Sequence, residues 1–298
     1  MIRLAFSTVA CPSWTLERVA AVAEELGFQG VELRSLISGV AGGGGGSASA
    51  PFASDPGLTS AEKARSIIDA RGLEVCSIAT GVRFDEPVFP PVIGYSLGVF
   101  DRPVRELKPY VSLASGVGAP FVRVFGFEAP EGSRRGKRLA RKRTVERLRL
   151  AADACHKTGA RLAIENGGDY PRGSDLASLI HEVNFPDIAA CYCVLPAWEA
   201  GEEFASGVAA LGDHLALARL VDFTDDGRPT AIGSGRIPCR RFVDAVNASR
   251  TAQWLVLEWD AAWVASDADP RAVLSASLAA VAPWLAPPAP HAARRVGV

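Results

Sequence analysis

Short apolar runs alternate with longer segments of helical periodicity along the whole chain. A strand buried on both faces forms a short continuous apolar run, whereas an amphipathic helix repeats apolar residues every three or four positions. Residues 162–164 form such a run, and residues 14–26 have the helical repeat and stop at Gly27. The pattern predicts strands over residues 2–8, 30–34, 73–80, 121–127, 161–165, 187–193, 214–221 and 254–259. It predicts helices over residues 14–26, 60–71, 101–116, 137–158, 174–183, 201–211, 238–248 and 269–285.

This alternation of strand and helix predicts a single (β/α)8 TIM barrel. The length of 298 residues is sufficient for such a barrel. The alternative is an open doubly wound sheet, but no GxGxxG motif follows an early strand. We expect the barrel to span residues 1–285. The Pro-, Ala- and Arg-rich residues 286–298 are expected to form a flexible tail.

Loops between the predicted elements carry further signals. Residues 41–57 are of low complexity and are expected to be mobile, with the glycine run 42–46 closing over the barrel mouth as a lid when a ligand binds. Residues 81–100 form a long irregular stretch, a length that indicates a functional or disordered loop. Ser174 is the expected N-cap of the helix over residues 174–183.

Composition narrows the class of protein. The chain is 48% hydrophobic and 22% charged, which is typical of a globular domain. A formal net charge of −1 gives no general attraction to nucleic acid or to an anionic membrane. No apolar run approaches the roughly 20 residues of a membrane span, and the first residues resemble a strand more than a signal peptide. We therefore expect a cytoplasmic protein whose six scattered cysteines are reduced thiols.

Two predicted strands end in a carboxylate. Glu165 follows the apolar run 162–164 and precedes Asn166 and two glycines, and Glu258 ends a second run over residues 254–257. A carboxylate at the end of a buried strand costs free energy unless it is paired, hydrated or bound to a ligand. In a parallel barrel the carboxyl ends of the strands form the active-site face, so we predict Glu165 and Glu258 as the catalytic residues. The other polar residues at strand ends are Glu32, Arg34, Thr80, Arg83, Arg123, Asn166, Tyr192, Cys193, Arg219, Asp222 and Asp260.

Several segments together resemble the xylose-isomerase-like TIM barrels. That family includes sugar and sugar-phosphate isomerases and epimerases, inosose dehydratases and relatives of apurinic endonucleases. The resemblance covers nearly the whole chain, and the order and spacing of its segments make it specific. The segments are EELGFQGVEL at 24–33, GAPFVRVFG at 118–126, LAIEN at 162–166, IGSG at 232–235 and LVLE at 255–258.

The resemblance implies a divalent metal held by a Glu, an Asp, a His and a Glu on strands five to eight. Glu165 and Glu258 match this set, but Cys193 and Arg219 stand where the Asp and the His are expected. Pro196 likewise replaces a His three residues after the Asp position. Arg219 is therefore expected to pair with Glu165 or Glu258 in place of a metal. The alternative cofactor is a divalent metal held by Glu165, Glu258 and Cys193.

The expected partner is a small polar substrate, and a substrate that carries an anionic group would also fit. Arg123 lies inside an apolar strand and needs an anionic partner, for which a substrate carboxylate or phosphate would serve. The basic residues 134–149 are interpreted as a solvated helix face, with attraction of an anionic substrate or an acidic partner as the alternative. Nucleic acid and membrane are not expected as partners. Whether the chain forms a homo-oligomer is left open by the sequence. The predicted substrate-binding residues are Glu32, Arg123, Asn166, Cys193, Arg219 and Asp222.

Two functional classes remain at this point. The first is an isomerase or epimerase for a sugar, polyol or hydroxy-acid, which would use Glu165 and Glu258 in acid/base chemistry without the family's metal; a lyase of the dehydratase type stays open. The second is a catalytically inactive barrel that serves as a small-molecule-binding or scaffold protein. An open site at the mouth would favour the first class, and a filled mouth would favour the second.

Overall fold

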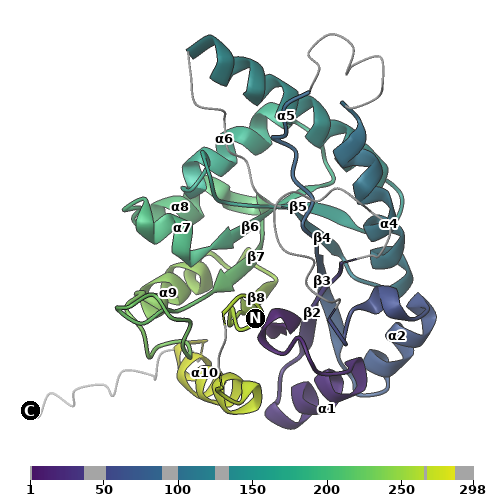
Figure 1. Ribbon diagram of the computed structural model, residues 1–298. Coiled ribbons are helices and arrows are strands. Elements are labelled where there is room, and N and C mark those ends of the chain that lie inside the picture. Colours follow the sequence, from purple (N-terminus) through teal and green to yellow (C-terminus); the bar gives the residue numbers. More distant parts are fainter. Residues whose placement is uncertain (1, 37–51, 89–99, 125–133, 265–266, 286–298) are drawn as a thin grey trace, which may run out of the picture.

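A closed barrel of parallel strands forms the centre of the molecule, and helices surround it (Figure 1). The computed structural model describes residues 2–36, 52–88, 100–124, 134–264 and 267–285. Each strand pairs with its neighbours in sequence, and β1 pairs with β8 to close the ring, which confirms the predicted TIM barrel. The strands are β1 Arg3–Ser7, β2 Gly30–Arg34, β3 Glu74–Ala79, β4 Phe121–Val124, β5 Arg161–Glu165, β6 Ile188–Cys193, β7 Leu215–Leu220 and β8 Trp254–Leu257.

In the described ranges the helices follow the predicted order, with one addition. They are α1 Leu16–Leu26, α2 Ala61–Asp69, α4 Arg102–Val117, α5 Arg134–Cys155, α6 Gly173–Val183, α7 Val194–Glu199, α8 Phe204–Leu211, α9 Cys239–Ser249 and α10 Pro270–Leu285. The short helix α7 was not predicted, because its six residues follow β6 without a turn signal and contain Pro196. The prediction for α1 is confirmed at its end, where Gly27 takes a φ of +88° as the C-cap.

The predicted N-cap of α6 is wrong. The helix begins at Gly173, and Arg172 holds the N-cap position. The backbone N–H of Gly173 donates to Glu202 Oε2 at 2.8 Å. A Cβ at this position would lie 2.5 Å from the carbonyl oxygen of Gly207. The close packing of α6 on α8 therefore fixes the start of the helix, and a cap on Ser174 does not.

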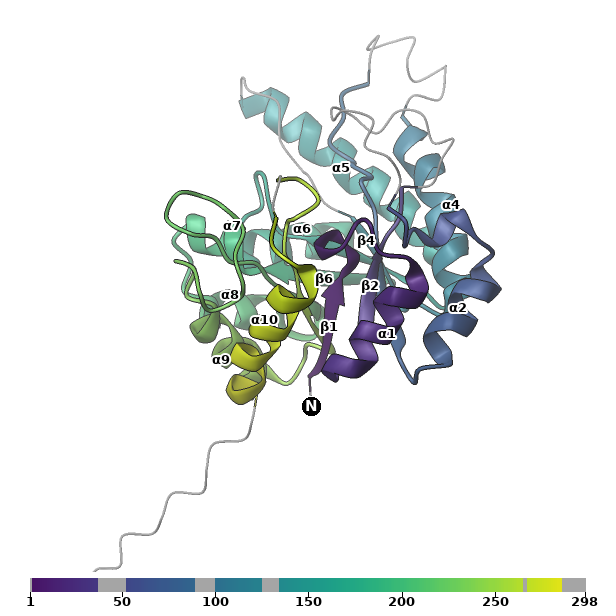
Figure 2. The same ribbon diagram turned by 60° about the horizontal axis from the view of Figure 1, so that its bottom comes forward.

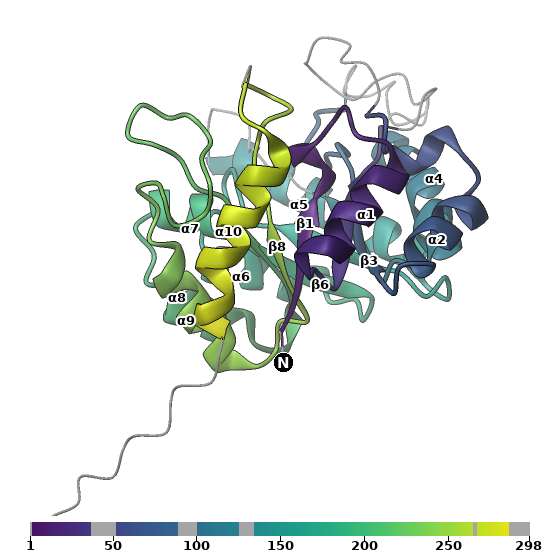
Figure 3. The same ribbon diagram turned by 90° about the horizontal axis from the view of Figure 1, so that it is seen from below.

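The barrel interior is stacked in layers that become charged toward one end. At the bottom the Trp254 ring fills the space beside Gly30, where a Cβ would lie 2.7 Å from a ring carbon. Above it lie small residues, among them Ala5, Cys76, Ala163, Cys191 and Val256. The next inward-facing positions are at the carboxyl ends of the strands. In Figures 2 and 3 the N-terminus is at the bottom, and β1 runs upward from it. The end of the barrel formed by the carboxyl ends of the strands is its mouth.

Part of the segment expected to be mobile is packed against the barrel. Phe52 and Asp55 are 3% and 4% exposed. The Asp55 carboxylate accepts hydrogen bonds from the backbone N–H groups of Leu36 and Gly57, at 2.5 and 2.8 Å. The expectation of a mobile loop is therefore wrong for residues 52–57. The glycine run 42–46, the irregular residues 89–99 and the predicted tail 286–298 lie outside the described residues.

The basic helix α5 binds neighbouring backbone. Arg147 is 1% exposed, and its guanidinium donates to the carbonyl oxygens of Phe84, Glu86 and Phe100 at 2.9, 2.6 and 2.8 Å. Arg149 donates to two further carbonyl oxygens at the end of α6. The interpretation as a solvated face is wrong for Arg147, because its charge meets carbonyl dipoles instead of water, whereas Arg149 is exposed to solvent.

Within the described part of the chain, no helix has the length and apolar character needed to cross a membrane. The cytoplasmic location and a homo-oligomeric assembly remain predictions.

Candidate active site

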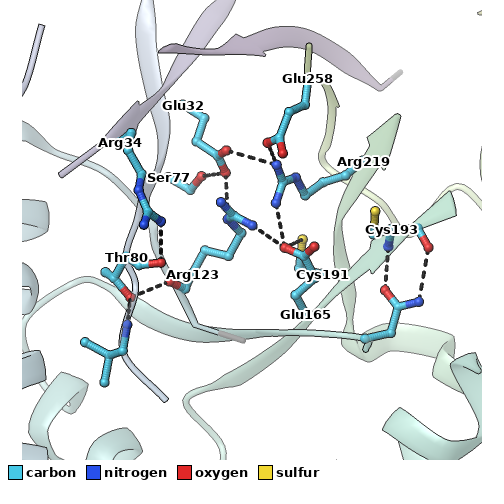
Figure 4. Close-up of polar contacts among 12 residues, drawn as sticks. Glu32, Arg34, Ser77, Thr80, Arg123, Glu165, Cys191, Cys193, Arg219 and Glu258 are labelled. Atoms are coloured by element: carbon cyan, nitrogen blue, oxygen red, sulfur yellow. Dashed lines mark hydrogen bonds and ion pairs between the residues drawn. The ribbon is translucent and has the colours of Figure 1, made fainter. Parts of the chain in front are cut away.

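Five charged side chains from five different strands meet at the mouth (Figure 4). Side chains alternate across a strand, so every second residue of a barrel strand points inward. Each of the five lies two positions after a residue of the barrel interior, as Glu165 follows Ala163 and Arg219 follows Leu217. We call them the charged cluster: Glu32 of β2, Arg123 of β4, Glu165 of β5, Arg219 of β7 and Glu258 directly after β8.

Arg219 bridges the two glutamates predicted as catalytic. Its Nη1 donates to Glu165 Oε2 at 2.6 Å, and its Nη2 is in contact with Glu258 Oε2. Glu32 Oε1 lies 3.7 Å from the same Nη2. Arg219 is 1% exposed, so these carboxylates balance its charge in place of water. The expected ion pair of Arg219 is therefore confirmed, and it involves both glutamates.

Arg123 forms the second link of the cluster. Its Nη1 donates to Glu165 Oε2, and its Nε lies 3.3 Å from Glu32 Oε2. Ser77 Oγ also donates to Glu32 Oε2, at 2.7 Å. Burial works against the charged form of Arg123, but Glu32 and Glu165 outweigh it and raise the arginine's pKa above its usual value. The anionic partner that the sequence required for Arg123 is thus supplied by the protein itself.

Each of the two bridged glutamates keeps one oxygen free. Oε2 of Glu165 receives both arginines, whereas Oε1 accepts no hydrogen bond from the described residues and is not buried. Glu258 has the same arrangement, with Oε2 on Arg219 and Oε1 without a partner among the described residues. The side chains of Glu165 and Glu258 are 13% and 12% exposed. Two carboxylates fixed by one guanidinium therefore present one oxygen each to the mouth.

The protonation of Glu165 is poised near neutral pH. Burial raises the pKa of its carboxyl group to about 7, while Arg123 opposes the shift and Glu32 and Asp260 add to it. Burial also raises the pKa of Asp260, and Arg123 again opposes it. A carboxyl group of this kind can accept and return a proton at neutral pH.

We expect the Glu165 carboxyl carbon to titrate near pH 7 in 13C NMR spectra, instead of near 4.5. Because Arg123 favours the ionised form, Arg123→Met should move the midpoint further up. Between these two pH values the folded chain holds more protons than the unfolded chain, so this group lowers the free energy of unfolding as the pH rises. Glu165→Gln assigns the signal, and Glu182→Gln on exposed α6 should leave it unchanged. A midpoint below pH 5 would contradict the shift.

Asn166 and Cys193 join the ends of β5 and β6. The Asn166 side chain donates to the carbonyl oxygens of Cys193 and Pro171 at 3.1 and 2.8 Å, and it accepts from the Cys193 backbone N–H at 2.6 Å. Burial, with the nearby Glu165 adding to it, raises the pKa of the Cys193 thiol well above its usual value. Both residues stand beside the cluster without an ion pair to it, and their substrate-binding roles remain predictions.

Asp222 holds the loop between β7 and α9. Its carboxylate accepts hydrogen bonds from the backbone N–H groups of Phe223, Gly233, Gly235 and Ile237, at 2.9, 2.9, 2.9 and 3.1 Å. A Cβ at Gly235 would lie 2.2 Å from Asp222 Oδ1, which explains the glycine in the IGSG segment. The contacts of Asp222 thus shape a loop at the mouth, and its predicted binding of substrate is not tested by them.

The residues at the mouth do not fit the divalent metal that the resemblance implies. Among the described residues, no group of three or more His, Cys, Asp and Glu side chains could hold a metal ion. The guanidinium groups of Arg123 and Arg219 stand between the glutamates, and the thiol of Cys193 strongly favours its protonated form. His214 lies in a short 3-10 helix before β7, at the opposite end of the barrel.

Sequence reasoning did not single out Ser77, which hydrogen-bonds Glu32, or Cys191, whose sulfur lies 3.9 Å from Glu165 Oε2. The register between β2 and β3 shifts after Val31, and this irregularity brings Ser77 opposite Glu32. No pattern in the sequence announces such a shift. Cys191 could have been found, because it lies two positions before Cys193 and so shares its inward side.

A family model described as Xylose isomerase-like TIM barrel matches residues 20–284. The chain belongs to this family. The predicted resemblance to the xylose isomerase-like barrels is therefore confirmed. The residues at the mouth of this barrel differ from the metal ligands that the resemblance implies. A comparison with curated proteins gives no match.

Solved structures of similar fold include several sugar epimerases. An L-ribulose 3-epimerase has a TM-score of 0.74 and 16% identity, over 96% of this chain and 95% of that one. A 3-keto-D-glucoside 4-epimerase from E. coli has a TM-score of 0.70 and 16% identity, over 95% and 100%. A D-allulose 3-epimerase from Methylomonas sp. has a TM-score of 0.71 and 14% identity, over 95% and 98%. At such identities the likeness shows the fold alone.

Proposed function

We propose that this xylose isomerase-like barrel is an isomerase or epimerase that moves a proton on a small polar substrate, a sugar, polyol or hydroxy-acid. The observation that supports the proposal is the pair Glu165 and Glu258, bridged by Arg219 with one oxygen of each free. The structures of similar fold that are named as sugar epimerases agree with this class of reaction.

In the proposed reaction Glu165 takes a proton from a carbon next to a carbonyl group. Its pKa of about 7 lets it act as the base in its ionised form and hold the proton afterwards. As this proton leaves, negative charge develops on the substrate oxygen, and the fixed charges of Arg123 and Arg219 stabilise it. Glu258 in its protonated form then delivers a proton from its free oxygen to another position of the substrate, which removes that negative charge. In this proposal the arginines supply the positive charge that the family's metal would give.

A specific observation favours the second candidate, a barrel that binds a small molecule without converting it. All three glutamates of the charged cluster already contact an arginine, and Glu32 is fully buried. Such pairing lowers the proton affinity of a carboxylate and fills part of the mouth. The two candidates differ in whether the free oxygens carry out proton transfer.

Proton exchange with heavy water tests the proposal directly. The protein is incubated in D2O with EDTA and with L-ribulose, D-allulose or a keto-acid, and the signal of the proton next to the carbonyl is followed by 1H NMR. We expect loss of this signal as deuterium enters, and a fall in its rate of about 100-fold or more in Glu165→Gln, as for the loss of a general base. Glu182→Gln is the matched control and should keep the rate.

The outcomes separate the candidates. Binding of a substrate without exchange would favour the binding protein and overturn the enzyme. Exchange that EDTA abolishes and Mn²⁺ restores would overturn the proposal that the arginines replace a metal.

A further inference from the structure

Arg34, the last residue of β2, is a buried cation for which the described residues provide no counter-ion. It is 7% exposed, and its charge lies at the mouth beside the charged cluster (Figure 4). Among the described residues no carboxylate lies within ion-pair distance of it. This separates Arg34 from Arg123 and Arg219, which each contact two or more glutamates.

The hydrogen bond of the Arg34 guanidinium goes to a neutral carbonyl group, so it does not balance the positive charge. Nη1 donates to the carbonyl oxygen of Thr80 at 2.5 Å, a contact that a neutral donor could equally make. Nε is buried and has no partner. Nη2 has no partner among the described residues either, but it is not buried, and it lies beside Gly81, where a Cβ would be 3.3 Å away. The Nη2 amino group of the guanidinium is therefore free to bind a ligand.

The carboxylates near Arg34 are engaged elsewhere. Glu32 is tied to Arg123 and Ser77, and Asp55 accepts bonds from Ser35 Oγ and two backbone N–H groups. Burial lowers the pKa of Arg34 to about 10, and the neighbouring Arg123 adds to the shift. An unpaired charge in such a place costs free energy unless a ligand compensates it. The ring of Trp263, which is 52% exposed, has its centroid 5.9 Å from the guanidinium carbon.

We propose that Arg34 binds a carboxylate group of the substrate at the mouth, so that the substrate is a hydroxy-acid or keto-acid and not a neutral sugar. The inference rests on the proposed function for the place of the substrate and narrows its class. A carboxylate matches the one positive charge at the mouth that has no carboxylate partner among the described residues; Arg83, three residues after Thr80, pairs with Asp85 at 2.7 Å. A phosphate dianion would bring one negative charge too many beside Glu165 and Asp260.

NMR titration of the guanidinium tests this inference without any turnover. The full chain is labelled with 15N-arginine, and the Nε–H signal of Arg34 is assigned from its absence in Arg34→Lys. Glycolate is expected to shift this signal in a saturable way at millimolar concentrations. Ethylene glycol, which lacks the charge, should leave it in place, and inorganic phosphate should bind at least ten times more weakly than glycolate.

Variants separate binding from a structural role. Arg34→Met should abolish glycolate binding measured by calorimetry, and Arg34→Lys should restore part of it because it keeps the charge. Arg65→Met, at an exposed arginine paired with Asp69 on α2, is the matched control and should bind as the wild type does. A structural role would instead lower the melting temperature of Arg34→Met. If that variant does not fold, the titration of the wild type decides.

Two results would overturn the inference. The first is an Arg34 signal that glycolate does not shift at tens of millimolar, and the second is phosphate binding as tight as that of glycolate. Failure of the proposed function is distinguishable, because it concerns proton exchange. Glycolate binding without exchange keeps Arg34 as an anion site on a binding protein, whereas exchange of neutral sugars without glycolate binding keeps the enzyme and removes the role of Arg34.

Discussion

Arg219→Ala is expected to lower the free energy of unfolding by about 3–5 kcal/mol, the usual loss when one member of a buried ion pair is removed. Arg219 is 1% exposed and contacts Glu165, Glu258 and Glu32. Without it, three carboxylates share the mouth with Arg123 as their only contacting cation among the described residues. Urea denaturation of both proteins gives the difference.

The loss should depend on pH. Like charges at short range raise the pKa of a carboxyl group, so one glutamate of the variant takes up a proton near neutral pH. The folded variant then binds more protons than its unfolded chain, and its stability falls further as the pH rises. The difference between wild type and variant should therefore be larger at pH 8 than at pH 5.5.

Two controls identify the cause of this loss. Arg65→Ala removes an exposed pair within α2 and should cost about 0.5 kcal/mol or less. In a Glu258→Gln background, Arg219→Ala should cost less than in the wild type, because one uncompensated charge is gone. A loss below about 1 kcal/mol for Arg219→Ala in the wild type would contradict a buried ion pair.

The second large effect is a gain of metal binding. Cys193→Asp with Arg219→His places an Asp and a His where the family has them, beside Glu165 and Glu258, which already stand on the corresponding strands. Cys193 and Arg219 are neighbours in the register of β6 and β7, so the two new ligands would lie side by side. We expect calorimetric titration with Mn²⁺ or Zn²⁺ to show binding that the wild type lacks.

Arg123 limits this gain, because it remains in contact with Glu165 in the double variant. Adding Arg123→Met removes a positive charge next to the new site and should tighten metal binding by about tenfold or more, because repulsion between a unit charge and a divalent ion about 6 Å apart costs roughly 1.4 kcal/mol even at the dielectric of water. Circular dichroism confirms that the variants fold. A folded triple variant that binds no metal at millimolar concentration would mean that Cys193 and Arg219 do not occupy the two ligand positions.

The periodicity of the sequence was sufficient for the barrel and for several exact boundaries. The strands β2 and β5 begin and end where the apolar runs predict. All five members of the charged cluster were also predicted as polar residues at the carboxyl ends of strands, because a charged residue at the end of an apolar run can be recognised in the sequence. The helix α7 was missed, since six residues give too little periodicity to recognise.

The partners of those charged residues could not be read in advance. Arg123 was expected to await a substrate anion, but the register of neighbouring strands sets Glu32 and Glu165 against it. The sequence likewise did not reveal that the loop after Asp222 folds back, so that four of its backbone N–H groups donate to the Asp222 carboxylate. Sequence shows which residues need a partner, whereas three-dimensional packing decides which partner they find.

The charged cluster also bears on how the barrel can assemble. A fragment that ends after β4 retains the contact between Glu32 and Arg123, whereas one that begins at β5 carries two glutamates of the cluster and a single arginine. The surplus carboxylate of the second half finds its cation, Arg123, only on the first half. The second half therefore cannot balance the charges of its own interior without the first, and unfolding is expected to proceed as one cooperative transition of the whole barrel.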